Sequence, residues 1–255
     1  MSNPFDSEAM AAGYAQSRPP VHPKVIELAR DRFEGRRFRR ILDVGCGAGI
    51  STAPLGLIAD SVVGIEPNSL MLRWADSVAP AARFVAGSAE ALPFRAATFD
   101  AISAAGALNY VDLEKFFAEA ERILEPGGAI VVYDFSQGRS FVDSDDLDRW
   151  FLDFMERFPP PAGEGRELTP ESLGDTSFTF GLSGGERFEI PIPLEHHFYV
   201  DYAMTETNVA AAIRRGVEPD KIREWCSNSL EPLFRRRTRD VLFRGYVAYF
   251  ERKSR

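Results

Sequence analysis

The sequence predicts an α/β protein in which helices wrap a mostly parallel sheet. Two observations carry this prediction. In the first half of the 255-residue chain, short apolar runs alternate with stretches of helical spacing, as is typical of parallel sheets. The first apolar run leads directly into three alternating glycines, Gly45, Gly47 and Gly49. Glycines at this place let the backbone turn sharply and approach a ligand closely, because they have no Cβ.

The elements follow from the periodicity of the apolar residues and from the turn residues between them. We expect strands near 40–44, 62–65, 83–86, 101–104 and 129–135, and helices from Ile50, over 69–77 and over 113–124. The run 241–250 is rich in strand formers and is expected to form the last strand, with a partner inside 188–202. In such sheets ligands bind beyond the carboxyl ends of the strands, so the residues that follow the strands are expected to meet in one crevice.

The residues around the glycines narrow the class of ligand that the loop can bind. The spacing differs from the dinucleotide fingerprint, which would place its third glycine at Ile50. Asp43 precedes the loop, where a negative charge would repel a diphosphate but suits a ligand with an ammonium group. Glu66 ends the second strand, at a place where an acidic residue accepts hydrogen bonds from ribose hydroxyls. The pattern therefore indicates a nucleoside that carries an amino group.

At this point the chain resembles the class I S-adenosylmethionine-dependent methyltransferases of the small-molecule type. The likeness covers about 5–136 and fades beyond it; its blocks are 41–49, 64–68, 87–94, 99–103 and 122–128. The resemblance implies a Rossmann-like fold of seven strands, mostly parallel with the last strand antiparallel, helices on both faces and a helical cap inserted after the fifth strand. It implies one structural domain with a cofactor-binding core and N-terminal lid (1–136), a substrate-recognition cap with the sixth strand (137–240) and a final core strand (241–255).

The resemblance also assigns roles to residues around S-adenosylmethionine. Asp43 and the backbone of the glycine loop would hold the methionyl group, Glu66 the ribose, and Tyr14 and Arg18 the methionine carboxylate. The remaining expected contacts are those of Cys46 in the loop, Pro67 on the adenine face, Ser88 and Ala89 on the adenine edge, and Ala105 after the fourth strand. Ser88 stands where the family usually has an aspartate, so its hydrogen bond to the adenine amino group would be a neutral one.

The acceptor side is less defined by the sequence. Asn109 and Tyr110 follow the fourth strand, at a position that often faces the acceptor in the family. His196 and His197 are candidate general bases, or alternatively polar residues at a strand edge; on a strand, one of the two could face the pocket. An aromatic helix face over 150–158 either lines an apolar acceptor pocket or packs a lid helix onto the main domain.

The composition of the chain argues against several classes of function. The net charge of −8 disfavours a nucleic-acid partner, and no apolar stretch approaches the roughly 20 residues that span a bilayer. The two cysteines lack the spacing of metal ligands, so we expect no metal site. The amino-terminal residues show no signal-peptide pattern, so we expect a cytoplasmic protein. We expect it to be a monomer or a homodimer. The predicted activity is methyl transfer to a small, partly apolar metabolite by in-line displacement. The alternatives are a non-catalytic S-adenosylmethionine or S-adenosylhomocysteine-binding protein (a sensor or partner subunit) and a nicotinamide oxidoreductase, which Asp43 and Ile50 disfavour.

Overall fold

A computed structural model describes residues 7–161, 166–176, 179–235 and 237–252. Their contacts group into two compact units. The first unit comprises 7–21, 136–161, 189–235 and 237–244, and the second comprises 22–135, 166–176, 179–188 and 245–252. Each unit is considered by itself below. No helix in the described part of the chain is long and apolar enough to cross a membrane.

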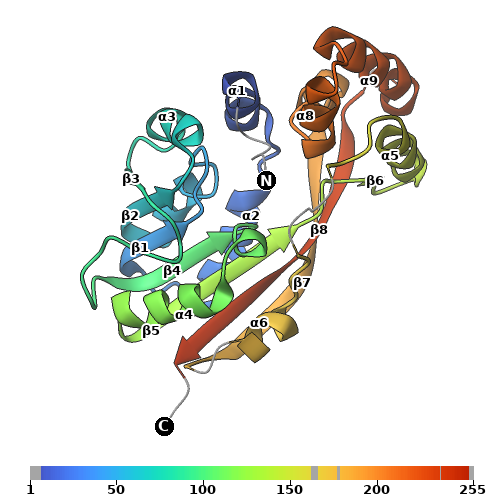
Figure 1. Cartoon of the computed structure of the whole chain (residues 1–255). Helices are drawn as coiled ribbons and strands as arrows, with labels where there is room; N and C mark the ends of the chain where they lie inside the picture. Colours follow the sequence, from blue (N-terminus) through green and yellow to red (C-terminus); the bar gives the residue numbers. More distant parts are fainter. Residues whose placement is uncertain (1–6, 162–165, 177–178, 236, 253–255) are drawn as a thin grey trace. The chain divides into compact units, whose positions relative to one another are not determined.

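The second unit contains the predicted parallel sheet (Figure 1). Its strands run in the order β3-β2-β1-β4-β5-β8, and β7 pairs with β8. The bounds are β1 Phe38–Val44, β2 Ala59–Glu66, β3 Arg83–Ala86, β4 Phe99–Ala105, β5 Leu124–Phe135, β7 Phe180–Leu194 and β8 Arg239–Arg252. Neighbouring strands from β3 to β5 are parallel, whereas β8 runs antiparallel to β5. The predicted fold class, with its antiparallel last strand, is confirmed.

Helices of this unit begin where side chains cap their free backbone donors. Asn68 accepts from the Leu70 N–H at the start of α3 (Ser69–Val78), and Asp112 accepts from the Lys115 N–H at the start of α4 (Leu113–Ile123). The other helices here are α2 (Val21–Arg32) and α6 (Pro170–Thr176). Apolar side chains of α4 pack with those of β4, β5 and β8 into a continuous core, of which Phe117 and Phe250 are an example. This core fixes the strand ends that carry the site.

One predicted helix is wrong. Instead of a helix from Ile50, turns lead into a 3₁₀ segment, η1 (Ala53–Leu57). Pro54 and Gly56 explain the difference, since proline lacks an N–H donor and glycine loses more backbone entropy in a helix than other residues. The loop after Gly49 is consequently held by side-chain contacts rather than by a regular helix.

The first unit is mainly helical. Its elements are α1 (Glu8–Ser17), β6 (Ser140–Phe141), α5 (Asp146–Arg157), α7 (His196–Ala203), α8 (Thr207–Arg214) and α9 (Pro219–Phe234). The short strand β6 pairs with Val241 and Leu242 of β8, and it raises the strand number above the predicted seven. The aromatic face of α5 is buried in this unit, where Trp150 stacks on Trp225 and donates a hydrogen bond to Ser229 Oγ at 2.7 Å. The face thus packs against α9 within this unit rather than onto a main domain as one of the two alternatives predicted.

The strand that pairs with the last strand covers only part of the range predicted for it. The partner of the last strand was expected inside 188–202, and β7 does pair with β8, but the strand ends at Leu194. The following residues form α7, whose buried side chains, Tyr199, Val200, Tyr202 and Ala203, recur at helical spacing.

Candidate functional site

The carboxyl ends of four strands meet at one edge of the sheet in the second unit. Val44 of β1 lies beside Ile65 of β2 and Ala104 of β4, and Ala104 lies beside Val132 of β5. The residues that follow these positions are therefore neighbours, as predicted. This unit contains the following predicted site residues: Asp43, Gly45, Cys46, Gly47, Gly49, Glu66, Pro67, Ser88, Ala89, Ala105, Asn109 and Tyr110.

The glycine loop has the backbone that its sequence requires. Gly45, Gly47 and Gly49 have φ angles of 68°, 53° and 87°, in the left-handed region that other L-residues rarely adopt. The Gly45 and Cys46 N–H groups both donate to the carbonyl of Ile65, at 2.9 and 3.1 Å, which ties the loop to β2. A Cβ on Gly45 would lie under 3.0 Å from the Cβ of Ala107. The loop therefore packs against the segment after β4.

Asp43 lies beneath this loop, with none of its surface exposed. Its Oδ2 accepts hydrogen bonds from Ser51 and Thr52, each at 2.7 Å, while Oδ1 has no hydrogen-bond partner among the residues that the structure describes. Burial raises the pKa of Asp43 to about 6, although the two hydroxyls favour the charged form. The carboxylate thus fixes the loop through Oδ2, and its other oxygen lies beneath the glycine loop without a hydrogen-bond partner in the described part of the chain.

Glu66 closes the other side of the loop. Its Oε2 accepts from the Gly47 N–H at 3.1 Å, and its Oε1 accepts from the Asn68 N–H at 2.9 Å. Burial raises the pKa of this carboxyl, and the two backbone donors counteract the rise. Each oxygen keeps a further lone pair, which is what a vicinal diol of a ribose needs.

We expect Glu66→Gln to weaken binding of S-adenosylhomocysteine by roughly 10- to 100-fold. The glutamine amide can accept from one of the two backbone N–H groups but presents its own NH₂ to the other, and an unpaired donor costs about 1–3 kcal/mol. Isothermal titration calorimetry measures the change. Asp60→Asn is the matched control, since Asp60 lies on the same strand with an exposed side chain. Equal losses in both variants would contradict the role of Glu66.

The segment after β3 provides the remaining edge. Ser88 is partly exposed, and Ala89 is buried. The Ala89 N–H makes no hydrogen bond within the described part of the chain, so it can donate to a ring nitrogen. Pro67 is exposed directly after Glu66. The donors and acceptors of this crevice fit an adenosine with an amino-acid tail: a carboxylate pair, a free backbone N–H and glycine backbone without side chains.

Ser88→Asp is expected to tighten cofactor binding several-fold at neutral pH. A carboxylate accepts from an amino group more strongly than a hydroxyl does, because charge-assisted hydrogen bonds are roughly twice as strong as neutral ones. The dissociation constant of S-adenosylhomocysteine, compared among wild type, Ser88→Asp and Ser88→Ala, measures this effect. If Ser88→Asp binds no better than Ser88→Ala, Ser88 does not face the adenine amino group.

Cys46 is buried, and its thiol lies 3.9 Å from the Gly47 carbonyl. Burial raises the pKa of this thiol, and the neighbouring charges of Asp43 and Glu66 raise it further. The thiol is therefore protonated at neutral pH and serves as a small side chain in the loop rather than as a nucleophile.

Ala105, a predicted cofactor contact, ends β4, and the predicted acceptor residues Asn109 and Tyr110 belong to the 3₁₀ segment η2 (Leu108–Tyr110). Tyr110 is 71% exposed. The Asn109 side chain donates from Nδ2 to Asp134 Oδ2 at 2.8 Å. Sequence reasoning missed Asp134, although a polar residue at the end of a buried parallel strand is the same signal that identified Glu66.

Tyr14 and Arg18, predicted at the methionine carboxylate, belong to the first unit. The Arg18 guanidinium lies 4.2 Å from the Tyr14 ring centroid and 3.4 Å from Glu206 Oε1. Its Nη2 also donates to the Thr205 carbonyl at 3.5 Å. Arg18 thus has partners inside its own unit, and its contact with a cofactor stays a prediction.

His196 and His197 also belong to the first unit, and the strand that was predicted for them is wrong. They begin the helix α7, so the argument that one of them faces a pocket from a strand no longer applies. His196 Nε2 lies 2.9 Å from the Ser227 carbonyl, which can accept but not donate. The His197 side chain is 74% exposed and lies 3.3 Å from Glu195 Oε2. Their role as bases stays a prediction.

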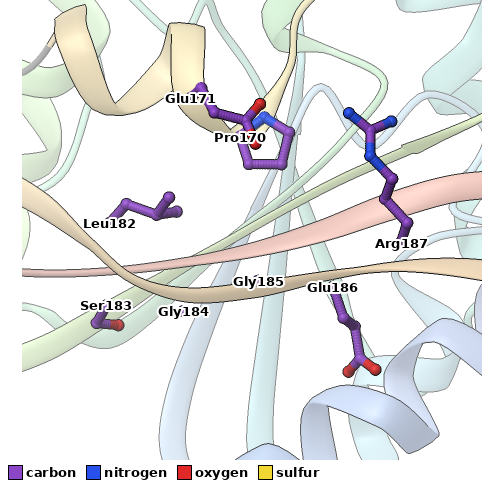
Figure 2. A pocket seen from close by; sticks show the side chains of 8 residues that line it. All are labelled: Pro170, Glu171, Leu182, Ser183, Gly184, Gly185, Glu186 and Arg187. Carbon is purple, nitrogen blue, oxygen red and sulfur yellow. The ribbon is translucent and has the colours of Figure 1, made fainter.

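A separate hollow of about 320 Å³ lies between α6 and β7, also in the second unit (Figure 2). It is lined by Pro170, Glu171 and residues 182–187. None of the predicted site residues lines it. Its walls are glycine backbone and exposed charged side chains, so we do not assign the active site to this hollow.

The fold and the donors and acceptors around the glycine loop are those expected of an α/β domain that binds a nucleoside, and comparisons with known proteins narrow the class of protein. A family model of the methyltransferase domain matches residues 42–132. A demethylmenaquinone methyltransferase from Renibacterium salmoninarum is 37% identical over 99 residues, which cover 38% of this chain and 42% of that protein. A malonyl-[acyl-carrier protein] O-methyltransferase from Enterobacter lignolyticus is 30% identical over 134 residues, covering 50% of this chain and 53% of that protein. The chain thus spans about half the length of the curated relatives it matches.

Among solved structures, a protein from Anaeromyxobacter dehalogenans described as a type II methyltransferase superposes with a TM-score of 0.62. It is 24% identical, and the match covers 84% of this chain and 89% of that one, so it supports the fold. Residues 42–132 are thus similar to the class I S-adenosylmethionine-dependent methyltransferases. Members of this class use S-adenosylmethionine as the methyl donor.

Proposed function

We propose that the protein transfers a methyl group from S-adenosylmethionine to a small, partly apolar metabolite. The observation that carries this proposal is a pair of carboxylates on the two sides of a glycine loop, that of Asp43 buried and that of Glu66 partly buried. Two negative charges in a crevice of low dielectric disfavour a diphosphate and favour a cationic ligand. A nucleoside with an ammonium group and a sulfonium centre is such a cationic ligand, and it contains no diphosphate.

The chain's own residues bind and orient, because methyl transfer is an in-line displacement that depends mainly on positioning. When bound, S-adenosylmethionine supplies an electrophilic methyl group. Gly47 and Gly49 give its methionyl part room, the Glu66 oxygens accept from the ribose, and Ala89 donates to the adenine. Asp43 keeps the loop in place through Ser51 and Thr52. Burial of Asp43, Ser51 and Thr52 excludes the water that would compete for their hydrogen bonds.

The acceptor class has weaker support. The names of the two relatives differ in acceptor, a quinone precursor for one and a malonyl group on a carrier protein for the other. The net charge of −8 favours neutral or cationic small molecules over polyanions. A small metabolite with an apolar part agrees with the charge and with the acceptor of the first relative, whereas the carrier-bound malonyl group of the second relative does not support it.

Binding and turnover are tested separately. Isothermal titration calorimetry with S-adenosylhomocysteine and with NAD⁺ is expected to show micromolar binding of the first and none of the second. Production of S-adenosylhomocysteine from S-adenosylmethionine is then followed by liquid chromatography over a panel of small acceptors. Binding without turnover on every acceptor would favour the non-catalytic alternative, and binding of NAD⁺ alone would overturn the proposal.

A further inference from the structure

Asp134 carries a hydrogen-bond arrangement that the cofactor does not explain. It lies near the carboxyl end of β5, where its Oδ1 accepts from the Phe135 N–H at 2.8 Å and its Oδ2 accepts from Asn109 Nδ2 at 2.8 Å. A Cβ on Gly106 would lie 3.2 Å from Oδ1, so the carboxylate packs closely against the segment after β4. Asp134 and Asn109 therefore form a fixed pair across two neighbouring strands.

The pair is placed next to the cofactor loop. The Gly106 N–H donates to the Tyr133 carbonyl at 2.9 Å, which joins the segment after β4 to β5. Ala107, two residues before Asn109, is the residue that the glycine loop packs against at Gly45. On its other side, the Asn109 carbonyl accepts from the Arg166 N–H at 3.2 Å. A molecule that contacts the pair would thus lie beside the glycine loop.

The chemistry of the pair determines what it can recognise. An ionised carboxylate only accepts hydrogen bonds, so Asn109 must turn its NH₂ group toward Asp134. The amide oxygen, Oδ1, then accepts no hydrogen bond from the described residues. The pair offers a ligand several acceptors, which are this oxygen and the spare lone pairs of Asp134. It offers one donor, which is the remaining N–H of the Asn109 amide. The pair therefore prefers a partner that donates.

The charges around Asp134 also favour a partner that donates hydrogen bonds. Burial raises the pKa of Asp134, the nearby Glu167 raises it further, and the bonds from Asn109 and Phe135 counteract the rise. Tyr246 lies opposite Asp134 on β8, and its own pKa is raised by burial and by the Asp134 charge. The titratable groups that interact with Asp134 are thus one acid and one phenol, and neither compensates its charge. An anionic partner would be repelled.

We propose that Asn109 and Asp134 form the acceptor subsite and select a neutral or cationic methyl acceptor that carries an O–H or N–H donor. The subsite excludes carboxylates and phosphates at the same position. This inference rests on the proposed function and adds to it the substrate class. Asp134 contacts the donor of the acceptor and positions the Asn109 amide at the same time.

The test uses the full chain saturated with S-adenosylhomocysteine and three matched probes: 2-naphthol, (2-naphthyl)methylammonium and 2-naphthoate. We expect the neutral and cationic probes to bind at least tenfold more tightly than the carboxylate, with shifts of the Asn109 side-chain amide signals in nitrogen-correlated NMR spectra. In Asp134→Asn the preference for the ammonium probe over naphthoate is expected to shrink at least tenfold, while affinity for S-adenosylhomocysteine changes less than twofold. Asp60→Asn is the charge-matched control and is expected to leave the preference unchanged.

If Asp134→Asn does not fold, Asp134→Ala provides the same test, because it removes the same charge. A change of preference cannot come from a merely structural role, which would weaken all three probes equally. Equal binding of the three probes to the wild type, or an unchanged preference in the variants, overturns the subsite while S-adenosylhomocysteine still binds. Loss of S-adenosylhomocysteine binding by the wild type overturns the proposed function, and the subsite with it.

Discussion

Gly45→Ala is expected to weaken binding of S-adenosylhomocysteine at least 100-fold and to lower the free energy of unfolding by about 1–3 kcal/mol. Two costs combine. The φ of 68° strains a residue with a Cβ, and that Cβ would lie under 3.0 Å from the Cβ of Ala107. The loop would relieve the clash by moving into the space where the cofactor binds. Calorimetry and chemical denaturation measure the two effects.

A matched control separates strain from clash. Gly35 has a φ of 74°, but a Cβ there would have no neighbour within 4 Å, so Gly35→Ala carries the strain alone. Ala107→Gly provides the reverse test, since it removes the atom that the new side chain meets. We expect Gly45→Ala combined with Ala107→Gly to recover most of the lost affinity, with a coupling above about 1 kcal/mol in the double-mutant cycle. Additive effects would show that the clash does not limit binding.

Much of the cofactor crevice could be predicted because its chemistry is local in sequence. Gly45 needs its backbone angle, Asp43 and Glu66 end apolar strands, and the register of a parallel sheet brings these ends together without further information. The strands were found because their β-branched runs are continuous and buried on both faces. What the sequence could not supply was the hydrogen bonding, such as the bonds that the hydroxyls of Ser51 and Thr52 donate to Asp43.

The errors have a common physical cause. His196 and the aromatic residues after it read as a strand by composition, whereas Tyr199 and Tyr202 are buried on one side of a helix by tertiary packing. Asp134 lies near the end of an apolar strand, as Glu66 does, but its pairing with Asn109, 25 positions away, leaves no local pattern. Contacts that depend on distant residues decide both cases, and those contacts appear only when the chain is folded.

Asp43→Asn is expected to make the ligand-free protein more stable at pH 7.5 while it weakens cofactor binding. The folded-state pKa of about 6 lies above the ordinary value of 3.8, so the folded protein binds the proton more tightly than the unfolded chain does. Ionisation of Asp43 therefore costs stability in full above pH 6, and the cost is relieved as the pH falls from 6 to 4. A shift of about two units corresponds to about 3 kcal/mol. The amide oxygen of the variant still accepts from Ser51 and Thr52.

The difference between wild type and Asp43→Asn isolates this residue, because Glu66 and Asp134 titrate in both proteins. Denaturation midpoints between pH 4 and pH 8 are expected to converge at low pH and to separate above pH 6, with the variant the more stable. Affinity of the wild type for S-adenosylhomocysteine is expected to fall as the pH drops below 6, since the neutral carboxyl no longer attracts the ammonium group. In the variant this pH dependence disappears. A variant that is less stable at pH 7.5 but binds the cofactor normally would show that Asp43 is a structural anchor alone. The reverse result would mean that the protein retains a strained charge because the cofactor requires it.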